Sequence, residues 1–156
     1  MSTLVDDACT EPCPVSDSRF FIVEDKCIFF EKRWMNRTNA NANCAKEMAK
    51  YGIGRLFEPK SLEMNNEVAT KVFTLIGLIA AHIGVNDIAK PDDYVYDSDS
   101  TPISFSPKWY DIDSTIYSPG NGIPFHQCTF ISMLENSYMG SWADYICSAS
   151  FYSICE

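Results

Sequence analysis

Short apolar runs rich in aromatic and β-branched residues stand near both ends of the chain. Residues 20–30 read Phe-Phe-Ile-Val-Glu-Asp-Lys-Cys-Ile-Phe-Phe, where a polar triplet separates two such runs. This pattern predicts two short strands joined by a turn. Similar runs at residues 128–133, 145–147 and 151–155 predict three more strands toward the C-terminus.

Two segments between these runs have the character of helices. Residues 40–50 are rich in helix-forming residues, place Cys44 and Met48 one turn apart, and are followed by Gly52 and Gly54, so they predict a first helix that ends before the glycines. Ser61 is a suitable N-cap for a second helix. The apolar run at residues 72–81 is half the length of a membrane span, which needs about 20 residues. We therefore expect a buried helix that passes into a core strand, and no membrane span.

The stretch from residue 91 to residue 124 is different, because it is full of Asp, Ser, Pro, Gly and Tyr and shows little helical periodicity. So long an irregular stretch inside a compact domain is usually functional or disordered. Its aromatic residues are favoured anchors at interfaces and can stack on sugar rings. The aromatic residues in or beside the stretch are Tyr94, Tyr96, Phe105, Trp109, Tyr110 and Tyr117. We expect about half of them, Trp109 included, to form the core of the loop, and the rest to mark a binding face.

Composition and charge narrow the functions that the chain can have. The 156 residues carry 12 Lys and Arg against 21 Asp and Glu, a formal net charge of -9, so nucleic acid is not an expected partner. The length fits one domain with its own core. Two histidines and no G-x-S-x-G or H-E-x-x-H motif give no sign of a nucleophile with its base, so we do not expect an enzyme.

The chain has seven cysteines, and their spacings match no zinc pattern. This predicts an oxidised, secreted protein. Asn36-Arg37-Thr38 is a sequon for N-glycosylation, which agrees with secretion. The N-terminus lacks the apolar stretch of a signal peptide, so we interpret the chain as a mature form with an added initiator Met, in which residues 1–12 are a tail.

An ordered set of residues resembles the C-type lectin-like domain in its long form, and it covers nearly the whole chain from Cys13 onward. Its members are Cys13-Pro14, Cys27, Ala40, Cys44, Leu56, Ser61-Leu62-Glu63, Asn66, Ile83-Gly84-Val85-Asn86-Asp87, Trp109, Cys128, Gly140-Ser141-Trp142-Ala143-Asp144, Cys147 and Ile154-Cys155-Glu156. The single motifs are weak, but W-x-D-x-x-C and the final C-x7-C-E in this order are specific to that family.

The resemblance implies an α+β fold over residues 13–156, with two helices flanking short antiparallel sheets and a long loop region that carries the ligand site. It also implies three disulfides, which pair Cys13 with Cys27, Cys44 with Cys155, and Cys128 with Cys147. Cys9 is left over. An odd cysteine in a secreted chain indicates either a disulfide-linked homodimer or a free or capped thiol, and both readings stay open.

The resemblance also locates the positions where sugar-binding members hold calcium. There the family has Glu-Pro-Asn or Gln-Pro-Asp, an acidic residue shortly before the third core cysteine, and the Asn and Asp of Trp-Asn-Asp. This chain has Ser118-Pro119-Gly120, His126 and Ala143 at these positions, and only Asp144 is kept. Calcium requires 6 to 8 oxygen ligands, so we expect no cofactor, although calcium remains possible.

The auxiliary calcium site is also incomplete. Asp87 and Asn121 stand at plausible positions, but Pro91 and Gln127 fall where carboxylates are expected. The remaining acidic residues of the region lie at 92–93, 97–99 and 111–113 without the spacing of an EF-hand. We expect them to form a solvated acidic loop.

His82 takes the place where the family usually has Trp before Ile-Gly. One reading makes it a pH-sensitive group near neutrality. We favour the other, a core histidine with one ring nitrogen bonded to a backbone carbonyl.

Together these features predict a secreted binding protein that recognises a protein or glycan ligand through its long loop, without the usual calcium-dependent sugar site. The candidate ligand contacts are Tyr110, Tyr117, Ser118, Asn121, His126 and Asp144. An alternative is a carbohydrate-binding lectin in which Asp144, Asn121, His126 and further oxygens of the loop rebuild a divalent site. A weaker alternative is a mineral- or surface-binding protein, since the acidic, Ser-rich loop suits mineral, while no regular Thr array favours ice.

Overall fold

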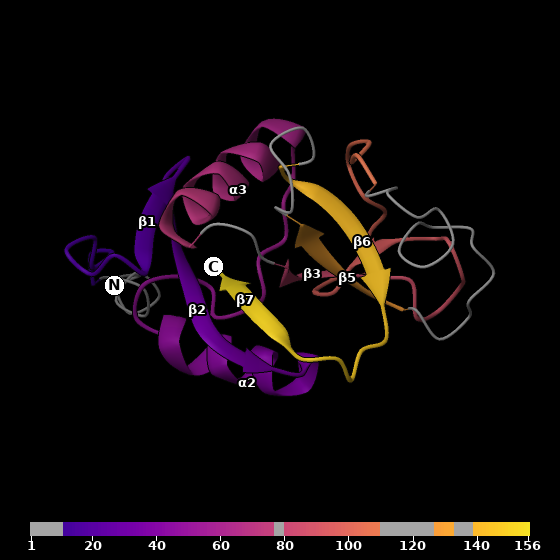
Figure 1. The fold of residues 1–156 in the computed structure, drawn as a ribbon, viewed down its shortest axis with the longest axis horizontal. Helices are drawn as coiled ribbons and strands as arrows, with labels where there is room; N and C mark the ends of the chain where they lie inside the picture. Colours follow the sequence, from indigo (N-terminus) through magenta and orange to yellow (C-terminus); the bar gives the residue numbers. More distant parts are fainter. Residues whose placement is uncertain (1–10, 77–79, 110–126, 133–138) are drawn as a thin grey trace, which may run out of the picture.

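One mixed β-sheet with a helix on either side forms the fold (Figure 1). The structure is a computed structural model that describes residues 11–76, 80–109, 127–132 and 139–156, with the backbone alone over 73–76. Its helices are α2 (Arg37–Met48) and α3 (Leu62–Ile76). Its strands are β1 (Phe20–Val23), β2 (Lys26–Met35), β3 (Ala80–Asn86), β4 (Val95–Tyr96), β5 (Cys128–Ser132), β6 (Ser141–Tyr145) and β7 (Phe151–Cys155).

The strand order in the sheet is β1-β2-β7-β3-β5-β6, with β4 paired to β3. Neighbouring strands are antiparallel except for β3 and β7, which run parallel. The expectation of short antiparallel sheets is therefore corrected in one detail, because the described strands make a single mixed sheet. The last strand in chain order lies near its centre, between β2 and β3.

The hairpin at the start of the chain forms where the sequence predicts it. Val23 pairs with Lys26 across a two-residue turn, and Glu24 and Asp25 have φ of 48° and 67°. Positive φ at both central residues is the geometry whose twist matches that of the flanking strands. The second strand continues five residues beyond the predicted end, to Met35.

Strand β2 buries both of its faces, which explains why its sequence does not alternate between apolar and polar residues. Ile28 and Phe30 belong to the core that α3 covers. Cys27 and Phe29 point the other way, into the core that α2 covers. The helices lie on opposite sides of the sheet in Figure 1, so β2 needs apolar side chains on each side.

Both predicted helices are present, although the first one runs from Arg37 to Met48 and not over residues 40–50. The helix α2 begins at Arg37, before the predicted start, because Asn36 caps it by accepting a hydrogen bond from the Asn39 amide. Ser61 caps α3 as predicted, through a 3.1 Å bond between its hydroxyl and the Met64 amide. The apolar run that starts at Val72 leads from this helix toward β3.

The predicted strand at residues 145–147 is wrong, since the strand there is β6 and ends at Tyr145. Ser141 and Ala143 gave no apolar signal in the sequence, yet both are buried within the strand. Their small side chains fit because the two faces of β6 are covered closely. Burial, and not side-chain hydrophobicity, marks this strand.

Three disulfides join the described elements, and they are the three pairs that the family resemblance implies. They link Cys13 to Cys27, Cys44 to Cys155, and Cys128 to Cys147. The second ties α2 to β7 across 111 positions of sequence, and a loop of this length corresponds to about 4–5 kcal/mol in the chain-entropy model. Cys9 lies outside the described residues.

A buried amide connects α3 to β6. Asn65, fully buried on α3, accepts a 2.8 Å hydrogen bond from the indole Nε1 of Trp142 and donates one of 2.8 Å to the Gly140 carbonyl. These groups have no access to water, so each needs its partner. The strand that carries Trp142 is therefore positioned by one side chain of the helix.

We predict that Asn65→Leu lowers the free energy of unfolding by about 2–4 kcal/mol, because it leaves the Trp142 indole N–H and the Gly140 carbonyl buried without partners. Urea denaturation followed by tryptophan fluorescence measures the effect. Glu67→Ala, an exposed change on the same helix, is the control and should stay within about 0.5 kcal/mol of the parent. A loss as small as that of the control would show that this amide is dispensable.

Candidate functional site

The segment Trp142-Ala143-Asp144 lies on β6, and its side chains alternate between the two faces of the strand. Trp142 is completely buried and meets Trp109 edge-on, with ring centroids 6.0 Å apart. Ala143 points to the opposite face, where it is buried opposite Phe130 of β5. Asp144 returns to the face of Trp142, beneath the loop that follows β3.

Asp144 is nearly inaccessible to solvent, with 3% of its surface exposed. Its Oδ2 accepts a 2.7 Å hydrogen bond from the Tyr94 hydroxyl. Its Oδ1 is buried and has no hydrogen-bond partner, and the same is true of the hydroxyl of Thr129, which lies directly opposite Asp144 in the register of β5 and β6. The ring of Tyr94 rests against Trp109, with centroids 4.7 Å apart.

A second buried carboxylate lies close enough to interact with the first. Asp87 follows β3, is 4% exposed, and accepts a 2.8 Å hydrogen bond at Oδ2 from the Asp92 amide. Its Oδ1 is also buried without a partner. We name Asp87, Tyr94, Thr129 and Asp144 the carboxylate cluster. It contains two acidic side chains, each with one oxygen that is removed from water and bonded to no described group.

Electrostatics favour the neutral form of both acids in the carboxylate cluster. Burial raises the pKa of Asp144 to about 6, against 3.8 ordinarily; the charges of Asp87 and Asp92 raise it as well, while the Tyr94 hydroxyl lowers it. Burial likewise raises the pKa of Asp87, although the Asp92 amide opposes the change. A buried carboxylate without a cation holds its proton more tightly for this reason.

The described donor set does not fit a calcium ion. Ala143 has no ligand oxygen, one oxygen of Asp144 is occupied by Tyr94, and calcium requires 6 to 8 oxygens. Within the part of the chain that the structure describes, no group of three or more His, Cys, Asp or Glu side chains could hold a metal ion. The orphaned oxygens of Asp87 and Asp144 are the only feature of the cluster that favours a cation.

Most of the predicted ligand contacts lie outside the described residues. These are Tyr110, Tyr117, Ser118, Asn121 and His126. Of the described aromatic residues of the loop, Tyr96 is buried, and Tyr94, Phe105 and Trp109 pack on the core around Trp142. This agrees with the prediction that Trp109 belongs to the loop core.

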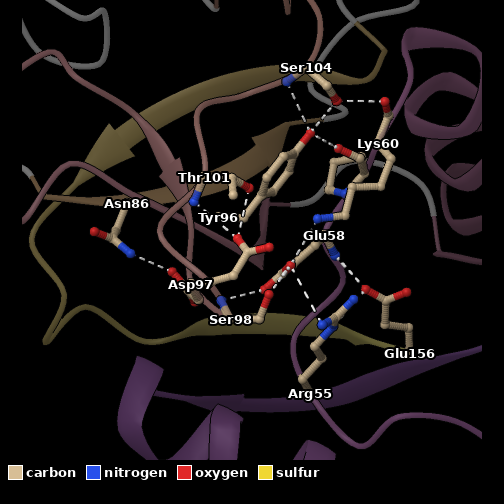
Figure 2. Close-up of polar contacts among 12 residues, drawn as sticks. Arg55, Glu58, Lys60, Asn86, Tyr96, Asp97, Ser98, Thr101, Ser104 and Glu156 are labelled. Carbon is tan, nitrogen blue, oxygen red and sulfur yellow. Dashed lines mark hydrogen bonds and ion pairs between the residues drawn. The ribbon is translucent and has the colours of Figure 1, made fainter.

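A second polar network, centred on Glu58, fastens the base of the same loop (Figure 2). Glu58 is 1% exposed, and its two oxygens accept hydrogen bonds of 2.7 and 2.8 Å from the hydroxyl and the amide of Ser98. Lys60 approaches the same carboxylate to 3.2 Å. Glu156 accepts from the Glu58 amide at 2.9 Å and from Arg55 at 3.1 Å. This network joins the loop to the end of β7.

The acidic loop is not wholly solvated, which corrects the expectation for Asp97. Its carboxylate forms an ion pair with the buried Arg37 of α2 and accepts a 2.6 Å bond from Asn86. Arg37 also donates to the carbonyl of Ile83 at 3.2 Å. Asp99 remains exposed and bonds only to Thr101. The sequence pattern D-S-D gave no sign that its first aspartate turns inward.

An open cavity of about 270 Å³ borders this network, lined by Asn41, Arg55, Leu56, Glu58, Asp97 and Ser98. Its acidic side chains are already satisfied by Arg37, Arg55, Lys60 and Ser98. No buried polar side chain in its lining lacks a partner. The network therefore serves to hold the loop and presents no unmet demand for a ligand.

His82 is a core residue, as the sequence analysis favours. It is 1% exposed, and its Nε2 lies 3.0 Å from the carbonyl oxygen of Met35. Burial lowers its pKa to about 4, with the Met35 carbonyl acting in the opposite direction. It is therefore neutral around pH 7 and does not act as a sensor there.

Comparisons with known proteins agree with this architecture. No known protein-family profile matches the chain. Collectin-10 of Xenopus tropicalis is 31% identical over 103 residues, which is 66% of this chain and 33% of that protein. The chain thus spans about a third of the length of this relative. The C-type lectin CEL-I of Cucumaria echinata superposes with a TM-score of 0.69 at 17% identity, covering 92% of this chain and 96% of the lectin.

The chain folds as a C-type lectin-like domain. A calcium-independent type II antifreeze protein has the same fold, with a TM-score of 0.65 at 22% identity over 88% of this chain and 89% of its own. The sequence resemblance predicts that Trp142, Ala143 and Asp144 correspond to the Trp-Asn-Asp of sugar-binding members. None of the helices in the described residues is long and apolar enough to cross a membrane.

Asp87 and Asp144 are candidates from the sequence alone, whereas the residues around them are not. Tyr94 was noted only as a loop aromatic, and its bond to Asp144 spans 50 positions of sequence. Thr129 was part of a predicted strand and drew no attention. Contacts at this separation leave no local pattern in the chain. The pairing of β5 with β6 places Thr129 opposite Asp144, and the path of the loop after β3 brings Tyr94 to it.

We predict that Asp144→Asn stabilises the protein at pH 7.5 in EDTA by about 1–2 kcal/mol. The folded-state pKa of Asp144 is raised, so the stability it contributes is complete below pH 3.8 and is lost as the pH rises through about 6. The gain from the variant should shrink toward pH 4. The lowered pKa of His82 acts in the opposite direction, but it cancels because both proteins carry it.

Urea denaturation of the two proteins at pH 4, 5, 6 and 7.5 measures this difference. Asp99→Asn, a change at an exposed acid, is the control and should show no gain in stability that grows between pH 4 and pH 7.5. A variant at position 144 that is less stable at pH 7.5 would show that the carboxylate has a favourable charged partner.

Proposed function

We propose that this C-type lectin-like domain is a secreted binding module that recognises a protein or glycan ligand through its long loop, without the calcium-dependent sugar site. The observation that carries the proposal is the state of β6. Ala143 is packed against Phe130 where a ligand oxygen would be needed, and Asp144 is turned to Tyr94. Strand β6 therefore lacks the free side-chain oxygens of a metal-dependent sugar site, while the fold that supports the loop is kept.

The relatives support a binding role of this kind. A fold shared with a collectin and with a C-type lectin favours ligand recognition as the task of the domain. The antifreeze protein is described as calcium-independent, so this fold stands without the ion in at least one protein. The three disulfides favour secretion, since such bonds persist in oxidising compartments.

Catalysis is not part of the proposal. The one described histidine, His82, is buried and bonded to a backbone carbonyl, and six of the cysteines form disulfides. The two acids of the carboxylate cluster are buried, so they are poorly placed to meet a substrate. Cys9 remains the candidate for a disulfide-linked homodimer, which would add avidity to either kind of ligand.

A second candidate function is a carbohydrate-binding lectin with a rebuilt calcium site. The buried, unpartnered Oδ1 atoms of Asp87 and Asp144 favour it, because a cation would satisfy both. The remaining ligands would have to come from the residues predicted for the alternative site, Asn121 and His126. Calcium requires 6 to 8 oxygens, so this candidate requires four or more besides the two Oδ1 atoms, which makes it the more demanding of the two.

Calcium titration separates the two candidates. We expect metal-stripped protein to show no calorimetric heat of binding up to millimolar calcium, and a melting temperature that changes by less than about 1 °C between EDTA and calcium. Asp144→Asn should behave in the same way. Binding at one site per chain, lost in Asp144→Asn but kept in Asp99→Asn, would establish the lectin with a rebuilt site.

The ligand face is tested by removing the aromatic residues of the loop. A glycan array and a screen of extracellular proteins, each with and without EDTA, supply the ligand. The double variant Tyr110→Ala and Tyr117→Ala should then bind it at least tenfold more weakly, since aromatic anchors carry much of the energy of an interface. Ile22→Ala, at an exposed apolar position on β1, is the control, and an equal loss in both would place the binding face elsewhere.

A further inference from the structure

An exposed tryptophan stands beside the sequon, where neither the core nor the carboxylate cluster uses it. Trp34 is 67% exposed, the largest exposed fraction among the large apolar side chains that the structure describes. Its indole contacts Tyr152 of β7, with ring centroids 5.8 Å apart and planes at 89°. Most of the indole surface is open to solvent. The exposed part of the indole is an apolar surface that a neighbouring group can cover.

The sequon lies two residues further along. Asn36 has extended backbone angles, with φ of -71° and ψ of 170°, and it directly follows the last residue of β2. Side chains two positions apart on an extended segment point to the same side, roughly 6–7 Å from one another. The side chains of Trp34 and Asn36 therefore lie on the same side of the chain. Arg37, the middle residue of the sequon, is buried.

The oxygen and the nitrogen of the Asn36 side-chain amide have different partners. Oδ1 caps α2 by accepting a 2.9 Å bond from the Asn39 amide. Nδ2 has no bond to any described residue, and it is not among the buried unpartnered atoms, so it reaches solvent. Glycosylation changes only Nδ2 and leaves Oδ1 as an acceptor. The helix cap and an attached sugar are thus compatible.

We infer that Asn36 carries an N-linked glycan whose first sugar packs on the exposed indole of Trp34. Thr38 is exposed at the third position of the sequon, and Asn36-Arg37-Thr38 is the only N-x-Ser/Thr sequence in the chain that lacks Pro at its centre. The sugar ring presents a face of C–H groups with partial positive charge. This face is attracted to the electron-rich face of an indole and removes apolar surface from water.

The modification is a group transfer with a defined balance. The Nδ2 of Asn36 forms a bond to the anomeric carbon of an oligosaccharide carried by a lipid diphosphate. The bond between that carbon and the diphosphate oxygen breaks, the diphosphate leaves with the electron pair, and one Nδ2 proton passes to a base. No oxidant or reductant takes part. The oligosaccharide donor belongs to the secretory pathway, so the inference rests on the proposed secretion of the protein. It does not depend on the identity of the proposed ligand.

Occupancy of the site is tested on the full chain secreted from mammalian cells behind a heterologous leader, which makes the result independent of how the chain is naturally exported. Release of the glycan by peptide N-glycosidase in heavy-oxygen water should leave a labelled aspartate at position 36 in more than half of the molecules. Thr38→Ala should abolish the label, and Thr38→Ser should retain it. A secreted chain with no label at this position would overturn the inference.

Packing on Trp34 is tested by comparing the protein trimmed to a single sugar with the unglycosylated Thr38→Ala variant. The sugar should raise the melting temperature by roughly 2–4 °C when Trp34 is present, and by less than about 1 °C in a Trp34→Ala background. Ile22→Ala is again the matched control and should keep the full increment. Equal increments in all backgrounds would show that the sugar does not rest on the indole.

A measurement that does not depend on stability completes the test. Of the three tryptophans, Trp142 is buried and Trp109 is packed on the core, so acrylamide quenches Trp34 preferentially. The quenching constant should fall by about half when the single sugar is attached. An unchanged quenching constant, together with equal melting increments, would show that the glycan on Asn36 does not pack on Trp34.

Discussion

The buried carboxylate of Glu58 constrains much of the architecture, because a charge removed from water must be paired. Its partners come from three directions: Ser98 of the loop, Lys60 ahead of α3, and Arg55, which also binds Glu156 at the end of β7. Breaking one partner of such a group leaves a buried charge uncompensated. Segments that are far apart in sequence are thereby held at a single point.

Close packing of the backbone accompanies this charge network. A Cβ atom at Gly84 would lie 2.8 Å from Cγ of Glu58 and 2.9 Å from the carbonyl oxygen of Leu56, so the Ile-Gly-Val motif needs glycine for steric reasons. From this anchored base the loop leaves β3, and it carries Tyr94 to Asp144. The orientation of the acid on β6 therefore depends on a carboxylate in another part of the molecule.

Local features of the sequence were enough to predict the hairpin at β1 and β2, the cap at Ser61 and the core role of His82. The order of the cysteines and of the W-x-D and C-E motifs was enough for the fold. What could not be predicted comes from pairs distant in sequence: Asp97 turns inward because Arg37 of α2 pairs with it, and the small residues Ser141 and Ala143 are buried in β6 because other elements cover them. Such residues look polar or featureless until their neighbours are known.

The central place of β7 in the sheet has a consequence for biosynthesis. A nascent chain can form the hairpin and both helices early, but β2 and β3 have no strand between them until residues 151–155 have left the ribosome. Cys44 meanwhile waits for a partner 111 positions later, with Cys13 and Cys27 already available to it. Such late, long-range closure is slow. Correct oxidation of this domain therefore depends on the exchange of any disulfide that Cys44 forms before β7 is available.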